Sequence, residues 1–433
     1  MTLTSQAEAN RTDDATDAGV LEIVQTSAAA RKTRRKSLGF IGAIALVLVY
    51  LGIASGSDRA NLRFGGIGDA TITVDARIFC LLCAVAAALV GLGLYRMPIR
   101  DKGSPVQMIA LSGSVLLFVV GLITWAARGE SASLAGIAEI CVSASIPLIF
   151  GATAGALCER AGAFNIAIEG EFLAAAFVAA MVGTIAGNPW VGLIGGILAA
   201  TGVGALLAVL TVRYQVSQVV AGIILMLLAT GLTGFLTYQI LDANPSKFNA
   251  SATMGKWEVP LLSEIPVIGQ AIFNQSPLFY LAVLTVVAVE FVLRRTRVGL
   301  RVRSVGENPK ATMASGVNAK RARFWTVTIA GAIAGAGGAY FTVGSTGQFV
   351  AGISSGLGFV SLAAVILGGW RPAQAALSAL LFGFATSLAT TFGLLGVGVS
   401  SSLLLMVPYI ITIVVVAGVV ANGKAPAAGG ATL

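Results

Sequence analysis

The sequence predicts an all-α protein: a polytopic membrane bundle of about 10–12 helical spans, with an inverted repeat and both termini in the cytoplasm. Three observations carry this prediction. The 433 residues are 56% hydrophobic and only 11% charged, with a mean hydropathy of +0.88, which is outside the range of soluble domains. Apolar runs of about twenty residues recur, the length that a helix needs to cross a hydrocarbon core. The Lys and Arg residues gather in alternate loops, which indicates an orientation.

The apolar runs define twelve candidate spans, of which residues 357–368 form a segment short enough to be re-entrant. The candidates are residues 39–55, 79–95, 106–127, 135–157, 165–183, 190–212, 216–238, 277–293, 324–343, 357–368, 373–394 and 402–421. With a cytoplasmic N-terminus, 22 of the 28 Lys/Arg lie in cytoplasmic segments. The external ones are Arg59, Arg63, Arg77, Arg128, Lys247 and Lys256. The positive-inside rule therefore selects the topology with both termini inside.

Composition also divides the chain into regions. Residues 1–38 are mostly polar, and we expect them to form a disordered cytoplasmic tail. The basic run at 31–36 before an apolar stretch is also found in signal peptides, but the preceding segment is too long, so we expect an uncleaved anchor. Residues 39–130 hold the first spans, residues 131–421 hold a core of the remaining spans, and residues 422–433 form a short cytoplasmic tail.

Residues 294–323 form a basic hydrophilic segment between apolar runs, with nine Lys/Arg and a single acid. Asn308 is a good helix N-cap because its side chain can accept a backbone N–H of the first turn. Pro309 suits the first helical position, where no N–H is needed, and Gly316 can adopt the left-handed conformation that ends a helix. The pattern predicts a short capped helix at about residues 309–315. Because a simple tether needs no such helix, we expect a partner to dock on it.

Residues 175–207 and 359–387 share one pattern: an apolar helix, a Gly- and Pro-containing turn, and a second helix rich in Gly and Ala. In the predicted topology the first copy starts inside and the second starts outside, so the copies are inverted. Inverted repeats with interrupted helices are typical of transporters, although a chance likeness between two apolar hairpins is an open alternative. Small residues four apart, such as Gly331 and Gly335, predict close packing of helices.

Ionisable groups are sparse within the spans. Asn165 and Glu169 lie four residues apart, hence on one helix face, and Glu290 can pair with Arg294. No chain of ionisable groups crosses the bilayer, which argues mildly against proton coupling. The sequence has no histidine, its four cysteines give no metal or disulfide pattern, and its nearest approach to a P-loop, residues 418–425, has Ala where Ser or Thr must bind Mg²⁺. We therefore expect no catalytic, metal or nucleotide site in this chain.

Four blocks resemble the signature of ABC importer permeases of the ribose, branched-chain amino acid and nucleoside branch. The blocks are residues 158–171 (CERAGAFNIAIEGE), 217–222 (SQVVAG), 295–311 (RTRVGLRVRSVGENPKA) and 356–372 (from GLGF to LGGWRP). They occur in the family's order within residues 146–418. The departures from the family's pattern are Ala161, Ala167, Ser217 and Ser304, which replace Ser, Gly, Asn and Ala. Each exchange replaces a small or polar group by a similar one, so the resemblance to the family is kept.

One further segment is similar to the nucleoside (basic membrane lipoprotein-dependent) permeases. Residues 260–275 read PLLSEIPVIGQAIFNQ, and the pattern of those permeases is P-x-L-S-x-I-P-x-x-G followed by F-N-Q. The resemblance implies a transport subunit, not an enzyme, that moves nucleosides inward by alternating access as a multi-pass protein of the bacterial cytoplasmic membrane. A simple-sugar (ribose-type) ABC permease and an ion-coupled secondary transporter are the alternatives.

The resemblance also implies partners and site residues. The partners would be a separate ATPase that holds ATP and Mg, a second permease subunit in a heterodimer, and an extracytoplasmic substrate-binding lipoprotein, with no cofactor in this chain and no nucleic acid. Coupling to the ATPase would fall to Gly306, Glu307, Asn308, Pro309, Lys310 and Ala311. The candidate substrate pathway comprises Asn165, Glu169, Gln218, Tyr340, Phe341 and Phe359.

Overall fold

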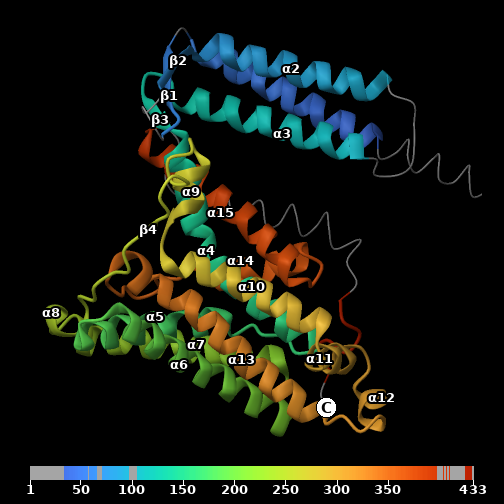
Figure 1. Cartoon of the computed structure of the whole chain (residues 1–433), viewed down its shortest axis with the longest axis vertical. Helices are drawn as coiled ribbons and strands as arrows, with labels where there is room; N and C mark the ends of the chain where they lie inside the picture. Colours follow the sequence, from blue (N-terminus) through green and yellow to red (C-terminus); the bar gives the residue numbers. More distant parts are fainter. Residues whose placement is uncertain are drawn as a thin grey trace, which may run out of the picture. The chain divides into compact units, whose positions relative to one another are not determined.

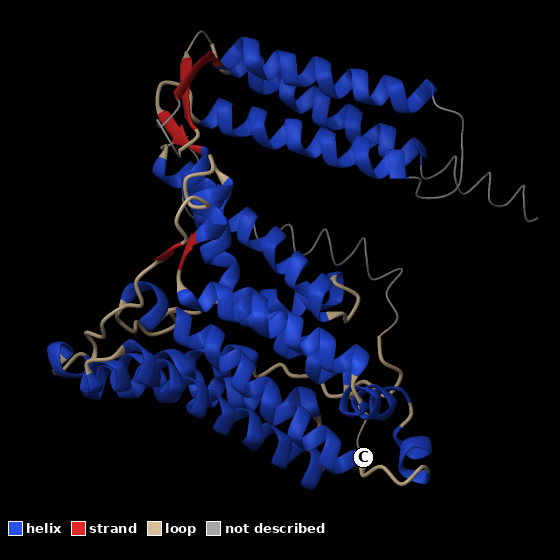
Figure 2. Cartoon of the chain, in the orientation of Figure 1, coloured by secondary structure: helices blue, strands red, loops and turns tan. Residues whose placement is uncertain are grey.

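Helices make up most of the described chain (Figures 1 and 2). The structure is a computed structural model that describes residues 34–56, 58–65, 71–96, 105–396, 403, 406, 409 and 425–431. Ten described helices are long and apolar enough to cross a membrane, and Leu357–Leu367 is a shorter apolar helix. The prediction of an all-α polytopic bundle is confirmed. Most of the predicted tail 1–38 and of the predicted span 402–421 lies outside the described residues.

The described residues fall into two compact units, of which the first lies within residues 34–64 and 71–134. Its helices are Arg34–Ala54, α2 (Ala76–Arg96) and α3 (Pro105–Ala126). Its strand β1 (Arg59–Arg63) pairs antiparallel with β2 (Thr71–Asp75) and parallel with β3 (Ser131–Ser133). Leu48 fills the space that Gly121 leaves on α3, and the Cys80 thiol donates to the Gly121 carbonyl at 3.3 Å. Small residues thus let these three helices pack closely.

The second unit comprises Gly65–Gly68 and Ala135–Leu433. Its long helices are α4 (Leu134–Arg160), α5 (Ile168–Ala186), α6 (Pro189–Ala208), α7 (Gln218–Leu236), α10 (Pro277–Arg295), α13 (Ala319–Tyr340) and α15 (Pro372–Leu394). Its short helices are α8 (Pro245–Phe248), α9 (Ile268–Phe273), α11 (Arg297–Glu307), α12 (Pro309–Ala314) and α14 (Leu357–Leu367). Three short π-helices extend α6, α7 and α13, namely η1 (Val209–Arg213), η2 (Thr237–Leu241) and η3 (Thr342–Thr346). Strand β4 (Trp257–Glu258) pairs antiparallel with β5 (Asn274–Gln275).

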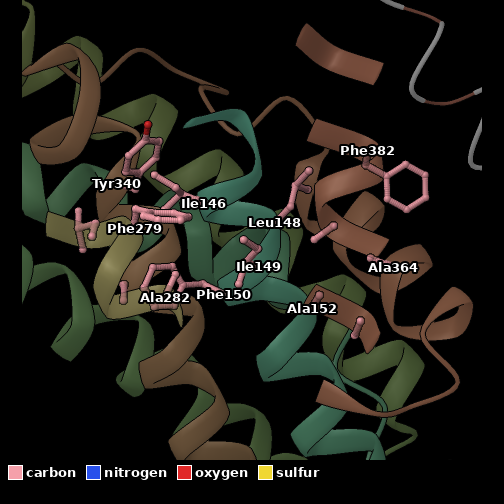
Figure 3. Close-up of a cluster of buried hydrophobic side chains, with 14 of the residues drawn as sticks. Ile146, Leu148, Ile149, Phe150, Ala152, Phe279, Ala282, Tyr340, Ala364 and Phe382 are labelled. Atoms are coloured by element: carbon pink, nitrogen blue, oxygen red, sulfur yellow. The ribbon is translucent and has the colours of Figure 1, made fainter. Parts of the chain in front are cut away.

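Three helices, α4, α5 and α13, form the centre of the second unit. In their most apolar windows 78, 67 and 72% of residues are buried, against 28–56% for the other four spans of this unit. One apolar cluster joins α4 to α10, α13, α14 and α15, and Figure 3 shows Ile146, Phe150 and Phe279 within it. The members of this cluster are buried and closely packed, which restricts the positions of the groups at its edges.

Glycine sets the distance between α6 and α13, which lie side by side with α5 (Figure 1). A Cβ on Gly204 would lie 3.0 Å from the Cα of Gly331, and one on Gly335 would lie 2.8 Å from the Cβ of Ala200. The predicted close packing at Gly331 and Gly335 is therefore confirmed. Gly202, on the same helix as Gly204, has no such neighbour within 4 Å.

Both segments of the predicted repeat fold as a helix, a tight turn and a second helix. α5 ends at Gly187, with φ +61, and α6 starts with Pro189 behind the Asn188 cap. α14 is followed by Gly369, with φ +58, and α15 starts with Pro372. In each turn the glycine supplies a left-handed backbone and the proline starts the next helix.

Candidate functional site

Two short helices, α11 and α12, occupy one end of the second unit, which we call the basic end (Figure 1). Thr296 caps α11, its hydroxyl accepting the N–H of Gly299 at 3.2 Å. Asn308 caps α12, its Oδ1 accepting the N–H of Ala311 at 3.0 Å, and Gly316 follows with φ +84. The predicted capped helix is confirmed, with Ser315 as its C-cap instead of its last residue.

The preceding helix, α11, was not anticipated from the sequence. Its buried face consists of Gly299, Val302, Val305 and Gly306, while its arginines lie on the other faces. These four residues follow one another at intervals of three, three and one, which places them on one face of a helix and is a sequence signal for it. It is weak because two members are glycines, which carry no side chain to mark an apolar face.

Backbone-to-backbone contacts fasten α11 to the bundle. A Cβ on Gly306 would overlap the carbonyl oxygen of Arg160, the last residue of α4. A Cβ on Gly299 would overlap the backbone at Val292 and Leu293 in α10. At these two glycines the backbone of α11 lies directly against the ends of α4 and α10, so these contacts leave no room for a larger side chain.

Arg323, in the first turn of α13, binds two chain segments at the basic end. Its side chain is 2% exposed, its Nε donates to the Ala161 carbonyl at 3.1 Å and one terminal nitrogen donates to the Ala431 carbonyl at 2.6 Å. The N–H of Ala428 donates to the Gly306 carbonyl at 2.9 Å. The described C-terminal residues thus lie between α11 and the turn after α4.

Two of the sequence blocks meet at Glu159 and Arg160. The Trp370 indole N–H donates to the Glu159 carboxylate. The Nε of Arg160 donates to the Trp370 carbonyl at 2.6 Å, and a terminal nitrogen donates to the Gly369 carbonyl at 3.4 Å. Because Gly369 and Trp370 both have positive φ values of +58, the turn between α14 and α15 presents its carbonyls to α4.

Glu169, in the first turn of α5, binds the N-terminus of α14. Its Oε1 accepts the Ser354 hydroxyl at 2.6 Å and the N–H of Gly356 at 2.8 Å, and its Oε2 accepts the N–H of Gly358 at 2.7 Å. The first N–H groups of a helix lack partners within the helix, and a carboxylate there also complements the helix dipole. Glu169 is therefore the cap that the sequence of α14 itself does not supply.

The chain between α4 and α5 enters the bundle without helical structure. Gly222 of α7 leaves room for Ile166 and Ala167, and Gly170 packs on the backbone of Met226. Gly170, in the first turn of α5, thus lies about 12 Å along α7 from Gln218, at 1.5 Å per residue. From Glu169, α5 runs to its contact with α8 and α14 runs toward Arg160 at the basic end. The two helices α5 and α14 therefore start from one point and run in opposite directions.

Three predicted pathway residues, Asn165, Glu169 and Gln218, form bonds within the protein. Asn165 is fully buried and donates to both carboxylate oxygens of Glu171, at 3.2 and 3.1 Å. The Oε1 of Gln218 accepts the N–H of Phe164 at 2.7 Å. In this conformation these groups hold the segment from 164 to 171 in place.

The other three pathway candidates are aromatic and differ in burial. Tyr340 ends α13 and is 8% exposed, whereas Phe359 of α14 is 45% exposed. Phe341 is partly buried and packs edge-to-face on Phe172 at 5.8 Å. The six candidates therefore differ in their surroundings, and their role in transport stays a prediction.

Tyr340 lines a cavity of about 360 Å³ at the opposite end of α13 from the basic end. Ser143, Gln275 and Ser276 contribute polar groups to it, and Lys256, which is paired with Glu139, also lines it. The Oε1 of Gln275 accepts the Ser143 hydroxyl at 3.2 Å, while its Nε2 has no partner among the described residues. The volume is near the lower end for small-molecule sites, which run from about 300 to 1,000 Å³.

Sequence reasoning missed several of the residues that build these sites. Trp370 and Arg323 belong to the motif blocks or the basic segment, but nothing in their spacing indicates which carbonyls they bind. Gln275 lies in the loop that resembles nucleoside permeases, although its position beside Ser143, 132 residues away, can be seen only in the fold.

Comparison with known proteins identifies the family to which the chain belongs. Residues 136–416 match the family described as the branched-chain amino acid transport system permease component. This match covers more than half of the chain, so the chain belongs to that family of transport permeases. No solved structure matches the chain.

Three relatives show which transport permeases the chain resembles. The chain is 39% identical to a nucleoside ABC transporter permease protein of Lactococcus lactis, over 66% of this chain and 92% of that one. It is 34% identical to a guanosine ABC transporter permease protein of Bacillus subtilis, with the same coverage of both chains. A putative glucose ABC transporter permease protein of Haloferax volcanii is 32% identical over 59% of this chain and 77% of its own length.

Proposed function

We propose that this chain is a transmembrane subunit of an ABC importer that moves nucleosides into the cell by alternating access. The observation that carries the proposal is α12, a capped helix that stands at the basic end and continues from α11, which contacts α4 directly. The nucleoside and guanosine permeases among the relatives support the substrate class. The basic end faces the cytoplasm in this proposal, in agreement with its nine Lys/Arg and the positive-inside rule.

A separate ATPase that holds ATP and Mg would dock on α12. Lys310, Ala311 and Met313 are exposed on this helix, and Glu307 is exposed just before it. An apolar side chain at the centre of such a surface can fill a groove in the partner, while the surrounding charges steer the encounter. A second permease subunit and an extracytoplasmic lipoprotein complete the proposed assembly.

Charge reversal at Glu307 or loss of Pro309 tests this docking. We expect Glu307→Lys and Pro309→Gly to insert normally but to reduce co-purification of the ATPase at least about tenfold, the effect of about 1.4 kcal/mol at an interface. Glu258→Lys is the matched control, because Glu258 is exposed on β4, away from the basic end. Normal ATPase assembly with both variants would rule out α12 as the docking element.

We further propose the Tyr340 cavity as the place where a nucleoside first contacts the permease. An aromatic ring can stack with a base, and the free N–H groups of Gln275 can donate to base or ribose oxygens. Ser143 and Ser276 add hydroxyl groups beside Gln275. The glucose permease among the relatives makes a simple sugar the second candidate substrate.

Substitution in this cavity should weaken substrate binding selectively. We expect Gln275→Ala to raise the KM for guanosine uptake about three- to tenfold, since one neutral hydrogen bond contributes about 0.5–1.5 kcal/mol. Tyr238→Leu should leave KM unchanged, because Tyr238 is 74% exposed on the bundle surface. Unchanged KM in Gln275→Ala would remove the cavity from the pathway. Competition of labelled guanosine by ribose but not by uridine would favour the sugar alternative.

A further inference from the structure

Four arginines surround a cavity of about 320 Å³ at the basic end. Arg160 ends α4, Arg294 lies in the last turn of α10, Arg303 lies on α11, and Arg371 precedes α15. The acid that lines the same cavity is Glu290. Guanidinium groups on four separate elements therefore converge on one space, which carries an excess of positive charge.

Glu290 and Glu307, whose charges both act on Arg160, are too few to neutralise four arginines. One oxygen of Glu290 is paired with Arg294, and the other accepts the N–H of Ala373 at 3.3 Å. Among the described residues, neither Arg303 nor Arg371 has a carboxylate within salt-bridge distance, and the Nε of Arg303 is buried without a hydrogen-bond partner. Bringing these cations together is unfavourable unless an anion joins them.

The cavity is built to hold its shape. The guanidinium of Arg160 is fixed by the carbonyls of Trp370 and Gly369, and α11 is held against α4 at Gly306. Preorganised guanidinium groups bind phosphate oxygens with paired, charge-assisted hydrogen bonds. Three apolar spans, Leu134–Arg160, Pro277–Arg295 and Pro372–Leu394, begin or end at this level, which is where headgroups or cytoplasmic solutes are accessible.

We propose that this cavity is a binding site for a phosphate ester. Its phosphate would bridge Arg303 on α11 to Arg160 and Arg371, and so restrain the coupling helices against the bundle. A phospholipid headgroup and a free nucleoside monophosphate present the same chemistry. The second source has a regulatory consequence that rests on the proposed function: a phosphoryl-transfer reaction that consumes imported nucleosides would generate the ligand that slows their import.

Two binding measurements on the purified transporter complex separate the two sources. One arm uses micelles of a maltoside detergent, which contain no phosphate, and measures binding of guanosine monophosphate. The other uses nanodiscs that contain phosphatidylglycerol and measures retention of that lipid by native mass spectrometry. In whichever arm binds, we expect the double variant Arg303→Gln/Arg371→Gln to reduce binding at least about tenfold, with Arg303→Lys/Arg371→Lys intermediate because it keeps charge but loses the paired geometry.

Arg213→Gln is the control, an exposed arginine at the end of another span. Binding in neither arm, or equal binding by the parent and the glutamine double variant, would overturn the proposal. Loss of ATPase assembly in the double variant without any phosphate binding would overturn it too, and would assign these arginines to a carboxylate of the ATPase. Neither binding measurement requires transport. A failure of the phosphate-site proposal would therefore leave the nucleoside-importer proposal unaffected.

Discussion

Glu169→Ala is expected to abolish uptake and to destabilise the bundle more than other single substitutions at polar positions. The substitution removes the acceptor for the Ser354 hydroxyl and for the N–H groups of Gly356 and Gly358. A buried donor without a partner costs about 1–3 kcal/mol, so the loss of stability should be on the order of 3 kcal/mol or more. The start of α14 would lose the carboxylate that joins it to α5.

Two milder variants show whether this effect arises from the helix cap. Glu169→Gln keeps one oxygen acceptor and should retain part of the stability, whereas Ser354→Ala removes one donor together with its bond and should cost about 1 kcal/mol or less. The midpoint of thermal unfolding in detergent measures stability, and guanosine uptake by cells measures function. Near-normal thermal stability of Glu169→Ala would show that α14 is held by other contacts.

Gly306→Val is expected to have the second largest effect, which is uncoupling of ATP hydrolysis from uptake. Its side chain would collide with the carbonyl oxygen of Arg160, a backbone atom that cannot turn aside. α11 must then separate from the end of α4, although the exposed surface of α12 remains available for docking. We expect the ATPase to co-purify with the variant and to hydrolyse ATP, while uptake falls at least about tenfold, as expected when a positioning contact is displaced by about 1 Å or more.

A matched glycine substitution controls for a general effect on helix packing. Gly202→Val places the same side chain on α6, where no atom lies within 4 Å of the added Cβ, and should leave uptake unchanged. Normal uptake by Gly306→Val would mean that α11 transmits nothing through its contact with α4. Loss of the ATPase from that variant would instead show that docking and transmission share one surface.

Much of this fold could be predicted from composition and capping alone. The apolar runs located the described spans because lipid imposes both their length and their composition. The chemistry of Asn308, Pro309 and Gly316 is local, so it correctly predicted α12. α11 was missed because glycines occupy half of its buried face.

The functional groups at the centre were harder to predict, because their partners are distant in the chain. Glu169 and Gly358 are 189 residues apart, and no periodicity relates them. A carboxylate in a span can equally indicate a substrate contact, a proton site or a helix cap, and only the fold identifies its partners. Gln275 and Ser143 illustrate the same limit for the cavity beside Tyr340.

Uptake of labelled guanosine by proteoliposomes is the most direct test of the central claim. The liposomes would contain this chain with its proposed second permease subunit, ATPase and lipoprotein, and α12 would face the interior. We expect uptake to require ATP inside the liposomes and to continue after proton and sodium gradients are collapsed. Uptake that proceeds without ATP and follows either ion gradient would contradict the account and identify an ion-coupled secondary transporter.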